Sequence, residues 1–483
     1  MKDVVVAGSG GAGLAAALTL AEGGAKVALF EKMAGPGGST NRTEGMFAAE
    51  SELQRRKEIR ISRDEAFKSI MDYSHWRADP AIVRAFVDKS ADTIEWLQIR
   101  GVEFIEPFAV WPNGLRTWHL LKGLGSTLVK VLVSCANNAG VEIHYGTAVE
   151  SIIRRPGSEV VGIVVEDTTR KRTKLDAMAV ILATGGYDYN EAWIKKYAGF
   201  DLGVNIVPAG SPGKTGDGIR MAWDIGAAEE GMGVLQLAVG GVLGSGGEPA
   251  LHGIAASFQP YLWVNLQGRR FADEGVAHNF VFSGNAISKQ KGGYSFTIFD
   301  EDIKRYLLEK GIDAALGAYV PVATRLAGLD AYIEASLAAG DSRAIEADGL
   351  RDLAGKMKID PAALERTVAE YNEFCKKGHD DRFAKDPRYL LPIKTPKFYA
   401  LRCSVAFLAT MGGIKINDRM EVLDRDHNVI PGLYAAGNDA GGMYGDSYDL
   451  FCPGSTLGFA VNSGRLAGEN AMAYVRALKG RMS

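Results

Sequence analysis

The sequence predicts an α/β protein built around a dinucleotide-binding domain of the Rossmann type, and three stretches of its 483 residues support this. Residues 3–31 run through an apolar strand, a glycine-rich turn, an alanine-rich helix and a second strand. Residues 179–186 form an apolar run that ends in small residues, as expected for a buried strand. A glycine-rich helix start at residues 453–458 lies near the other end of the chain.

The composition is that of a packed globular chain. The formal net charge is -3, 47% of the residues are hydrophobic, and no apolar run approaches the length of a membrane span. The length suggests two to three domains. Cys135, Cys375, Cys403 and Cys452 are scattered without a CxxC pair, which favours structural thiols in a reducing compartment. A strand that already begins at Val4 leaves no room for a signal peptide. We therefore expect a cytoplasmic protein without a nucleic-acid partner, metal site or membrane span.

Gly8, Gly10 and Gly13 form a G-x-G-x-x-G turn between the first strand and the helix. Gly8 permits the tight turn, Gly10 lets the backbone approach a pyrophosphate, and Gly13 lets the helix pack close to the strand. The helix start then directs unpaired N–H groups at the phosphates. Glu31 closes the second strand, where a carboxylate accepts hydrogen bonds from ribose hydroxyls. Strand, helix and acid are all in place, so the pattern favours a dinucleotide site over an ordinary glycine-rich turn.

Further glycine-rich stretches distinguish FAD from NAD. They are PGGST at residues 36–40, ATGG at 183–186, GLYAAGND at 432–439 and PGSTLG at 453–458. Together with the N-terminal turn, they resemble the FAD-binding domain of the fumarate reductase/3-ketosteroid dehydrogenase flavoprotein superfamily. The resemblance covers almost the whole chain in order, and this combination is far more specific than any single motif.

In that superfamily the first and last segments build one FAD domain, which a capping domain interrupts. The resemblance implies a Rossmann-type FAD-binding domain of residues 1–235 plus 393–483. An α+β capping domain of residues 236–392 is then expected to close over the flavin and exclude water. Residues 360–378 within it have helical periodicity. The first histidine is His75, so the N-terminal flavin loop lacks the histidine that succinate dehydrogenase relatives link covalently to FAD. Non-covalent FAD is therefore expected.

The resemblance also implies which residues contact FAD. Residues 214–218 (KTGDG) match the flavin-side loop of the family, although an ordinary helix start with Asp217 near its N-terminus is the alternative. The expected cofactor-binding residues are Gly8, Gly10, Gly11, Ala12, Gly13, Glu31, Lys32, Gly38, Ser39, Thr40, Ala183, Thr184, Gly185, Asp217, Gly437, Asn438, Asp439, Ser455 and Leu457.

The groups with which fumarate reductases hold a dicarboxylate are missing at the matching positions. Those enzymes use two histidines and two arginines, because two buried carboxylates need cationic or donor partners. The histidines fall near Ala238 and at Ala409, and one arginine falls near Phe451. Fumarate is therefore not the expected substrate.

The segment RFADEGVAH, residues 270–278, carries the expected proton-exchange group. At the position of His278 the fumarate reductases have the arginine that delivers the proton, and the 3-ketosteroid dehydrogenases have a tyrosine that acts as base. A histidine suits this step because its unperturbed pKa lies near physiological pH. The Glu and Arg of the fumarate reductase proton relay fall near Ile254 and Ser257 here. The alternative is a packing histidine beside Glu274.

The 3-ketosteroid dehydrogenases hold the ketone oxygen with a second tyrosine and a backbone N–H, which fall near Phe451 and Ser455. Phenylalanine cannot donate a hydrogen bond. The candidates to replace it are Tyr444, Tyr448 and Ser455.

Residues 111–119 (WPNGLRTWH) occupy the stretch that lines the substrate cavity in relatives. The aromatic residues suggest an apolar, ring-sized pocket, but tryptophans serve equally well in a core. Arg116 either binds a substrate carboxylate or pairs at the surface. The residues assigned to the substrate pocket are Arg116, Trp118, Ala409 and Phe451.

These observations predict an FAD-dependent oxidoreductase that forms or reduces a C–C double bond beside a ketone in a hydrophobic cyclic substrate, steroid-like or smaller. A hydride moves at flavin N5 and a side chain exchanges a proton at the neighbouring carbon. Two alternatives stay open: an enoate reductase for an unsaturated monocarboxylate, anchored by Arg116, and a flavoprotein that only transfers electrons. The small-molecule substrate and the electron donor or acceptor are not identified by the sequence.

Overall fold

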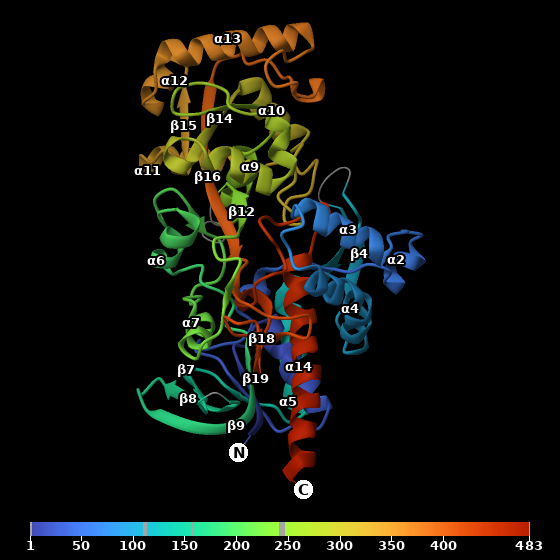
Figure 1. The fold of residues 1–483 in the computed structure, drawn as a ribbon. Coiled ribbons are helices and arrows are strands. Elements are labelled where there is room, and N and C mark those ends of the chain that lie inside the picture. The colour runs from blue at the N-terminus through green and yellow to red at the C-terminus, as the bar shows by residue number, and fades with distance from the viewer. Residues whose placement is uncertain (1, 110–113, 157, 241–246, 483) are drawn as a thin grey trace. The chain divides into compact units, whose positions relative to one another are not determined.

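The structure is a computed structural model that describes residues 2–109, 114–156, 158–240 and 247–482. This part of the chain divides into two compact units, each of which mixes helices and strands (Figure 1). Unit 1 comprises Met1–Gly199, Gly210–Gln236 and Ala409–Ser483, and unit 2 comprises Phe200–Ala209 and Leu237–Leu408.

An eight-stranded sheet lies at the centre of unit 1. Its strands are β1 (Lys2–Ala7), β2 (Val27–Phe30), β6 (Glu142–His144), β7 (Thr147–Arg154), β8 (Val160–Asp167), β9 (Arg172–Leu182), β18 (Glu421–Leu423) and β19 (Val429–Ala435). The order is β18-β19-β9-β1-β2-β6, and β8 pairs with β9 and β7. The pairs of β1 with β2, β1 with β9, and β9 with β19 are parallel, so the glycine-rich loops after β1, β9 and β19 leave the same edge of the sheet.

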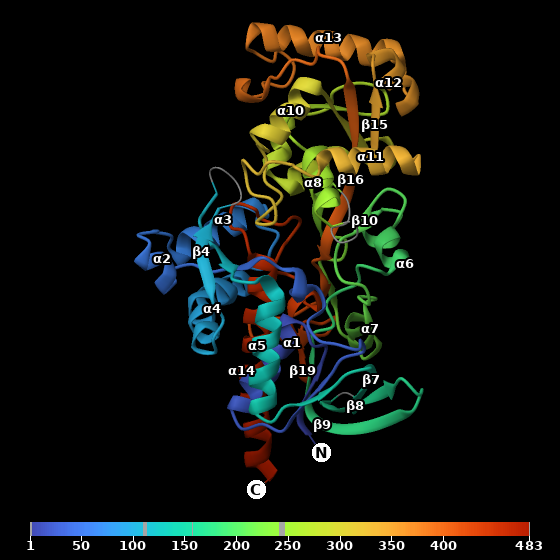
Figure 2. The ribbon, with the colours of Figure 1, turned by 180° about the vertical axis from the view of Figure 1, so that it is seen from behind.

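Three helices lie side by side at this sheet: α1 (Gly11–Glu22), α5 (Leu124–Asn138) and α14 (Ser455–Met482) (Figure 2). Helix α1 is rich in alanine and leucine and is buried nearly all round, as a helix without a polar face must be. It packs against α14, so the first and last segments of the chain share one core.

The remaining elements of unit 1 surround this core. A three-stranded sheet joins β3 (Gly45–Phe47), β5 (Trp118–Leu121) and β4 (Phe104–Phe108), and a two-stranded sheet joins β11 (Glu229–Glu230) and β17 (Gly413–Ile414). The helices are α2 (Glu52–Arg56), α3 (Arg63–Tyr73), α4 (Pro80–Ile99), α6 (Glu191–Trp193) and α7 (Asp217–Asp224), with the short turns η1 (Gly38–Arg42), η2 (Ile194–Ala198) and η6 (Gly437–Asp439).

Unit 2 is built on a six-stranded sheet. Its strands are β10 (Val207–Pro208), β12 (Leu235–Val239), β13 (Leu262–Val264), β14 (Tyr294–Asp300), β15 (Ala344–Ala347) and β16 (Phe398–Thr410). Strand β16 pairs with β10, β12, β14 and β15, and β13 extends the sheet from β14. The helices are α8 (Gly247–Ser257), α9 (Phe280–Ser288), α10 (Glu301–Glu309), α11 (Leu329–Ala339), α12 (Leu350–Met357) and α13 (Pro361–Lys377), with η3 (Glu274–His278), η4 (Lys291–Gly293) and η5 (Pro387–Tyr389).

The boundaries of the units differ from those of the expected domains at two places. The chain changes unit after Leu408 rather than after residue 392, because β16 pairs with β14 and β15 from Phe398 to Ser404. Residues 200–209 also belong to unit 2, because β10 pairs with β16. That unit 2 caps the flavin stays a prediction.

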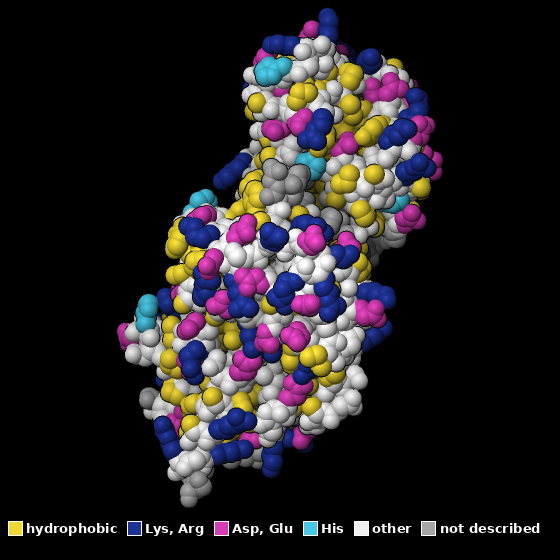
Figure 3. Space-filling view, turned by 90° about the vertical axis from the view of Figure 1, so that its right-hand side faces the viewer, with side chains coloured by type: hydrophobic (Ala, Val, Ile, Leu, Met, Phe, Trp, Pro, Cys, Tyr) yellow, Lys and Arg dark blue, Asp and Glu magenta, His cyan; other side chains and the backbone are white. Residues whose placement is uncertain are grey.

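The surface carries charges of both signs. Acidic and basic side chains are interspersed on the face in Figure 3, in keeping with the net charge of -3. Among the described residues, no helix combines the length and the apolar character needed to cross a bilayer.

Candidate active site

The glycines around the start of α1 differ in the room that the protein leaves for a side chain. Gly8 has a φ of +101°, and a Cβ at Gly13 would lie 1.8 Å from the Gly8 carbonyl oxygen, so both glycines serve the packing of β1 and α1. For a Cβ at Gly10, in contrast, the nearest atom would be 3.9 Å away. Gly10 also caps α1 without a side-chain hydrogen bond. A side chain at Gly10 would therefore meet no clash within the protein, so the packing of β1 and α1 does not require glycine at this position.

Two distant segments meet at the same end of α1. The Gly11 N–H donates to Thr40 Oγ1 at 2.9 Å, and Leu457 Cδ1 would lie 3.4 Å from a Cβ at Gly11. Ser39 Oγ accepts a hydrogen bond from the Ser211 N–H at 3.0 Å. The short turn η1 and the start of α14 thus lie at the glycine turn.

Glu31 follows β2 and turns back toward the glycine turn. Its Oε2 accepts from the N–H and Oγ of Ser9, at 2.9 and 2.7 Å, and its Oε1 accepts from the Met33 N–H at 2.9 Å. These bonds hold the carboxylate in place, and Oε1, which accepts one hydrogen bond, keeps capacity to accept a ribose hydroxyl.

Asp439 joins two of the expected FAD-binding loops. Its carboxylate accepts from the Thr184 N–H at 2.6 Å, from Thr184 Oγ1 at 2.9 Å and from the Gly186 N–H at 2.9 Å. The side chain is fully buried, and this burial raises its pKa. A Cβ at Gly218 would lie 2.6 Å from Asp439 Oδ2, so α7 also approaches this carboxylate closely. Asp439 therefore shapes the loop after β9.

Lys32 and Asp217, both expected to contact FAD, bind each other. Lys32 Nζ lies 2.5 Å from Asp217 Oδ2 and donates to Thr215 Oγ1 at 3.0 Å. Thr215 Oγ1 donates in turn to Asp217 Oδ1 at 2.9 Å. The pair ties the loop after β2 to the start of α7.

A second ion pair was not expected from the sequence. Asp188 and Lys214 form a buried salt bridge, and Asp188 Oδ1 accepts from the Thr410 N–H at 2.9 Å. A Cβ at Gly185 would lie 3.3 Å from the Lys214 side chain, which places the pair beside the ATGG loop. The sequence signal that could have pointed to this pair is Asp188, the acid in YDY (residues 187–189), which follows the two glycines of the ATGG loop.

Tyr444 and Tyr448 are buried beside the start of α14 and bind backbone groups there. Tyr444 Oη donates to the Ser455 carbonyl oxygen at 3.2 Å, and Tyr448 Oη accepts from the Gly454 N–H at 3.1 Å. Burial raises the pKa of both phenols. These bonds brace the turn that leads into α14, and the catalytic role assigned to Tyr444, Tyr448 and Ser455 stays a prediction.

Arg116 and Trp118 lie before and on β5. Arg116 donates through Nε and Nη2 to the Pro107 carbonyl oxygen, at 3.2 and 3.1 Å, and Trp118 is 9% exposed. Trp111, at the start of the same stretch, lies outside the described residues. Part of the Arg116 guanidinium is thus used to hold β4.

Apolar side chains occupy the other positions of the expected substrate pocket. Ala409 is buried near the end of β16, and Phe451 packs edge-on against Tyr73 with ring centres 5.8 Å apart. Neither side chain is able to bind a carboxylate.

The RFADEGVAH segment in unit 2 is anchored by a buried ion cluster of Arg270, Glu274, Asp380 and Lys385. Arg270 makes two hydrogen bonds to Glu274, at 2.8 and 2.7 Å, and two to Asp380, at 3.1 and 2.8 Å. Lys385 Nζ lies 3.3 Å from Glu274 Oε2 and donates to the Tyr261 carbonyl oxygen at 2.6 Å. All four side chains of the cluster are inaccessible to water. Bidentate hydrogen bonds between an arginine and a carboxylate fix both the position and the orientation of the two side chains.

His278 ends the short helix η3, which begins at the capping residue Asp273. Its Nε2 lies 2.8 Å from Tyr389 Oη, and the two ring centres are 5.4 Å apart. Burial lowers the pKa of His278, and the nearby Asp313 carboxylate opposes this shift. The neutral imidazole is therefore the main form at neutral pH.

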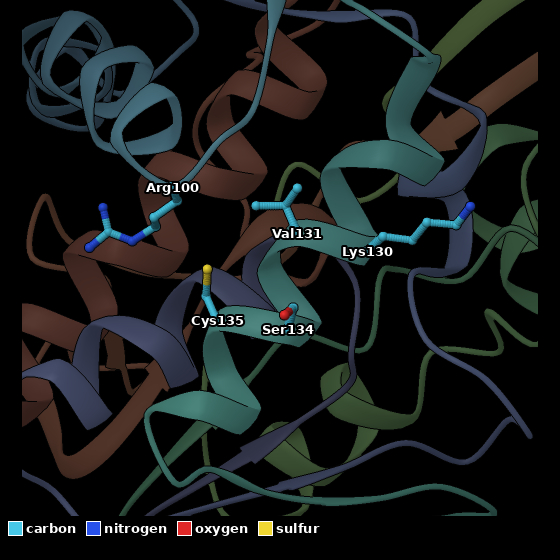
Figure 4. Close-up of a pocket in the computed structure, with 5 residues that line it drawn as sticks. All are labelled: Arg100, Lys130, Val131, Ser134 and Cys135. Atoms are coloured by element: carbon cyan, nitrogen blue, oxygen red, sulfur yellow. The ribbon is translucent and has the colours of Figure 1, made fainter.

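The hollow in Figure 4 does not form an anion site. It measures about 250 Å³ and is lined by Arg100, directly after α4, and by residues of α5. Arg100 and Lys130 point in opposite directions, away from Val131 between them (Figure 4). The Arg100 guanidinium also pairs with Glu22. Nothing at this hollow relates it to the flavin loops.

The described residues contain no group of three or more His, Cys, Asp or Glu side chains placed to hold a metal ion. All four cysteines are free thiols.

Comparison with known proteins identifies the family to which this chain belongs. A family model described as "FAD binding domain" matches residues 3–451. Vinyl phenol reductase of Lactiplantibacillus plantarum is 38% identical over 98% of this chain and 96% of its own length. The cytochrome-type fumarate reductase of Shewanella frigidimarina is 31% identical over 98% of this chain and 77% of its own length.

The chain belongs to the FAD-binding fumarate reductase flavoprotein family. The solved 3-ketosteroid delta1-dehydrogenase of Sterolibacterium denitrificans has the same fold, with a TM-score of 0.80 over 98% of this chain and 99% of that one, at 21% identity. The glycine at position 10, the start of α1 behind it and the Glu31 carboxylate are residue types that fit the diphosphate and ribose of FAD. This flavoprotein is therefore an FAD-dependent oxidoreductase.

Proposed function

We propose that this flavoprotein reduces a C–C double bond in an uncharged, hydrophobic, ring-bearing substrate, where the double bond is conjugated to a ketone or to a phenol. A cyclic enone and a para-vinylphenol are the two forms of such a substrate. Its size ranges from a single ring to a steroid, and desaturation is the reverse of the same reaction.

One observation carries the proposal: apolar residues replace the dicarboxylate ligands of the family. One histidine of the fumarate reductases falls near Ala238 and the other at Ala409, one arginine falls near Phe451, and both alanines are buried. A carboxylate buried without a cationic or donor partner is strongly disfavoured. The vinyl phenol reductase relative, matched along 96% of its length, supports the proposal independently.

The chemistry needs two contributions. FAD, when bound, supplies or accepts the hydride at its N5 atom. We assign the proton exchange to His278, at the neighbouring carbon of the substrate. In a cyclic enone the proton reaches the carbon next to the carbonyl. In a para-vinylphenol the ring passes electron density from the phenol oxygen to the terminal vinyl carbon, so that carbon takes the proton and the ring-attached carbon takes the hydride. One C–C π bond is lost and two C–H bonds form in either case.

The proposal includes non-covalent FAD and a cytoplasmic location. His75, the first histidine of the chain, lies 3.0 Å from Asp446 at the protein surface, between α3 and α4. The four free thiols are compatible with a reducing compartment.

The substrate test uses the FAD-loaded protein, reduced anaerobically with dithionite. Para-vinylphenol, cyclohexenone and fumarate are then added in turn, and the return of the oxidised flavin absorbance is followed together with the product. We expect para-vinylphenol or cyclohexenone to reoxidise the flavin at least about tenfold faster than fumarate. Reoxidation by fumarate alone would overturn the proposal, and reoxidation by none of the three would favour a pure electron carrier.

A second candidate, reduction of an unsaturated monocarboxylate, depends on Arg116. Two of the Arg116 N–H groups already bind the Pro107 carbonyl oxygen, which weakens this candidate. It predicts that cinnamate reoxidises the reduced flavin and that Arg116→Met raises the KM for cinnamate sharply. Unchanged KM in that variant would remove the candidate.

A further inference from the structure

The pair formed by His278 and Tyr389 joins two segments of unit 2 that lie far apart in the sequence. Tyr389 ends η5, 111 residues after His278, and its Oη lies 2.8 Å from His278 Nε2. The distance is that of a short hydrogen bond between a hydroxyl and an imidazole nitrogen. Tyr389 and His278 are both half-buried, so water reaches part of each residue.

Both partners of this hydrogen bond are fixed by the same ion cluster. On one side, Glu274 of the cluster belongs to η3, the helix that ends at His278. On the other side, the Tyr389 carbonyl oxygen accepts from Tyr371 Oη at 3.1 Å, and Tyr371 Oη lies 3.1 Å from Lys385 Nζ of the cluster. The helix that ends at His278 and the backbone of Tyr389 are therefore both anchored to one ion cluster that is inaccessible to water.

The proton relay of the fumarate reductases has no counterpart at its expected positions. Ile254 has no titratable group, and Ser257 Oγ donates within helix α8 to the Ile254 carbonyl oxygen at 2.8 Å. Both residues are buried. The residues at these two positions are therefore unable to renew the proton of His278.

We infer that Tyr389 is a positioning residue that passes the proton between solvent and His278. This inference rests on the proposed function, in which His278 exchanges the proton of the substrate. During reduction the Nδ1–H bond breaks as the C–H bond forms, the Tyr389 O–H bond breaks as the Nε2–H bond forms, and the tyrosinate regains a proton from water. Desaturation runs the same steps in reverse, and no electrons move in this relay.

The charges around the pair suit such a transfer. The groups that face His278 are Asp313, Arg388, Asp273 and Asp386, and those that face Tyr389 are Arg388, Asp313 and Asp386. The Arg388 guanidinium lies 5.4 Å from the Tyr389 ring centre, where it stabilises the transient tyrosinate. Burial keeps His278 neutral, and a neutral imidazole gives up one proton readily only when its other nitrogen gains one.

The test replaces Tyr389 with phenylalanine, which removes the hydroxyl and keeps the ring. The matched control is Tyr306→Phe, because Tyr306 Oη binds Asp313 at 2.9 Å in the same surroundings. Each FAD-loaded variant is reduced, and its reoxidation by para-vinylphenol, or by cyclohexenone if that is the better substrate, is measured from about pH 5 to pH 9.

We expect the wild type and Tyr306→Phe to keep a broad plateau around neutral pH. Tyr389→Phe should lose activity by about tenfold for each pH unit above the pKa of His278, because only the imidazolium is then able to deliver the proton. A Tyr389→Phe profile that parallels the wild type would overturn the inference.

The outcome of His278→Phe separates this inference from the proposed function. If His278→Phe keeps wild-type activity, the proton-exchange role itself is wrong. If His278→Phe is inactive and Tyr389→Phe has the wild-type profile, the role of Tyr389 alone is wrong.

Should Tyr389→Phe fail to fold, fluorotyrosine at position 389 keeps the hydrogen bond and makes the hydroxyl more acidic. The relay then predicts an altered alkaline limb of the profile, and an unaltered limb would refute it.

Discussion

His119 and His278 show how the partner of a ring nitrogen decides what a histidine does. His119 is fully buried, with Nδ1 2.8 Å from the Thr117 carbonyl oxygen and Nε2 2.7 Å from Ser51 Oγ. A carbonyl only accepts, so Nδ1 carries the proton, Nε2 accepts from Ser51, and the neutral ring is locked in one tautomer. At His278 the partner is a phenol, which both donates and accepts, and this arrangement permits proton exchange.

His278→Phe should leave FAD binding intact and lower turnover at least about a hundredfold, the usual effect of losing a general acid or base. Flavin absorbance of the purified variant reports FAD binding, and the rate of reoxidation by substrate reports turnover. Near-wild-type turnover would make His278 a packing residue.

His119 should make the protein less stable in acid. Burial lowers its pKa from 6.5 to about 4, so between these values the unfolded chain takes up a proton that the folded chain refuses. The stability contribution is complete above pH 6.5 and is lost as the pH falls toward 4, by up to roughly 3 kcal/mol. Urea unfolding near pH 7 and near pH 4 measures this loss. His119→Gln should lose less stability over that interval, whereas the exposed control His427→Gln should behave like the wild type.

At the scale of elements, the junction of β1 and α1 assigns different tasks to glycines that share one motif. Gly13 has no room for a side chain, because its Cβ would lie 1.8 Å from the backbone of Gly8. Gly10 has room within the protein, since its Cβ would be 3.9 Å from the nearest atom. The fold therefore requires glycine at position 13, whereas we expect the glycine at position 10 to serve FAD binding.

Gly10→Ala and Gly13→Ala should therefore fail in different ways. Gly10→Ala should keep the thermal stability of the FAD-free protein. It should raise the Kd for FAD at least about tenfold, because the methyl group blocks the approach of the diphosphate. Gly13→Ala should destabilise even the FAD-free protein by roughly 1–3 kcal/mol through overpacking. Calorimetry of both FAD-free variants and titration with FAD distinguish the two effects. An equal loss of stability in both variants would contradict the assignment.

At the scale of the whole molecule, segments from both ends of the chain come together in unit 1. The loops after β1, β9 and β19 leave one sheet edge, and α14 packs on α1. A ligand that binds these loops stabilises the folded state of the unit without being linked to the chain.

Denaturation should release all of the flavin, because we propose that FAD is bound non-covalently. Acid precipitation followed by absorbance of the supernatant measures the released fraction, and the mass of the denatured chain should contain no flavin. Refolded protein at a free FAD concentration of about a hundred times Kd should gain roughly 2.7 kcal/mol of stability over the FAD-free form. Flavin that stays with the precipitate would indicate a covalent link.

The sequence by itself determined the α/β class, the glycine cradle at residues 8–13 and the helix at residues 360–378. These features depend on local signals: a glycine where a side chain cannot fit, an apolar period of two or 3.6 residues, and capping residues such as Asp360. The motif order of the whole chain also identified the flavoprotein family, which the comparisons confirm.

Only the tertiary structure decided which side chains meet. Lys32 pairs with Asp217 across 185 residues, Asp439 holds the loop at Thr184 across 255, and His278 meets Tyr389 across 111. No local pattern encodes such contacts, because they depend on the pairing of strands far apart in the chain. β16, for example, belongs to unit 2 because it completes the sheet there, and its sequence alone does not name its partners.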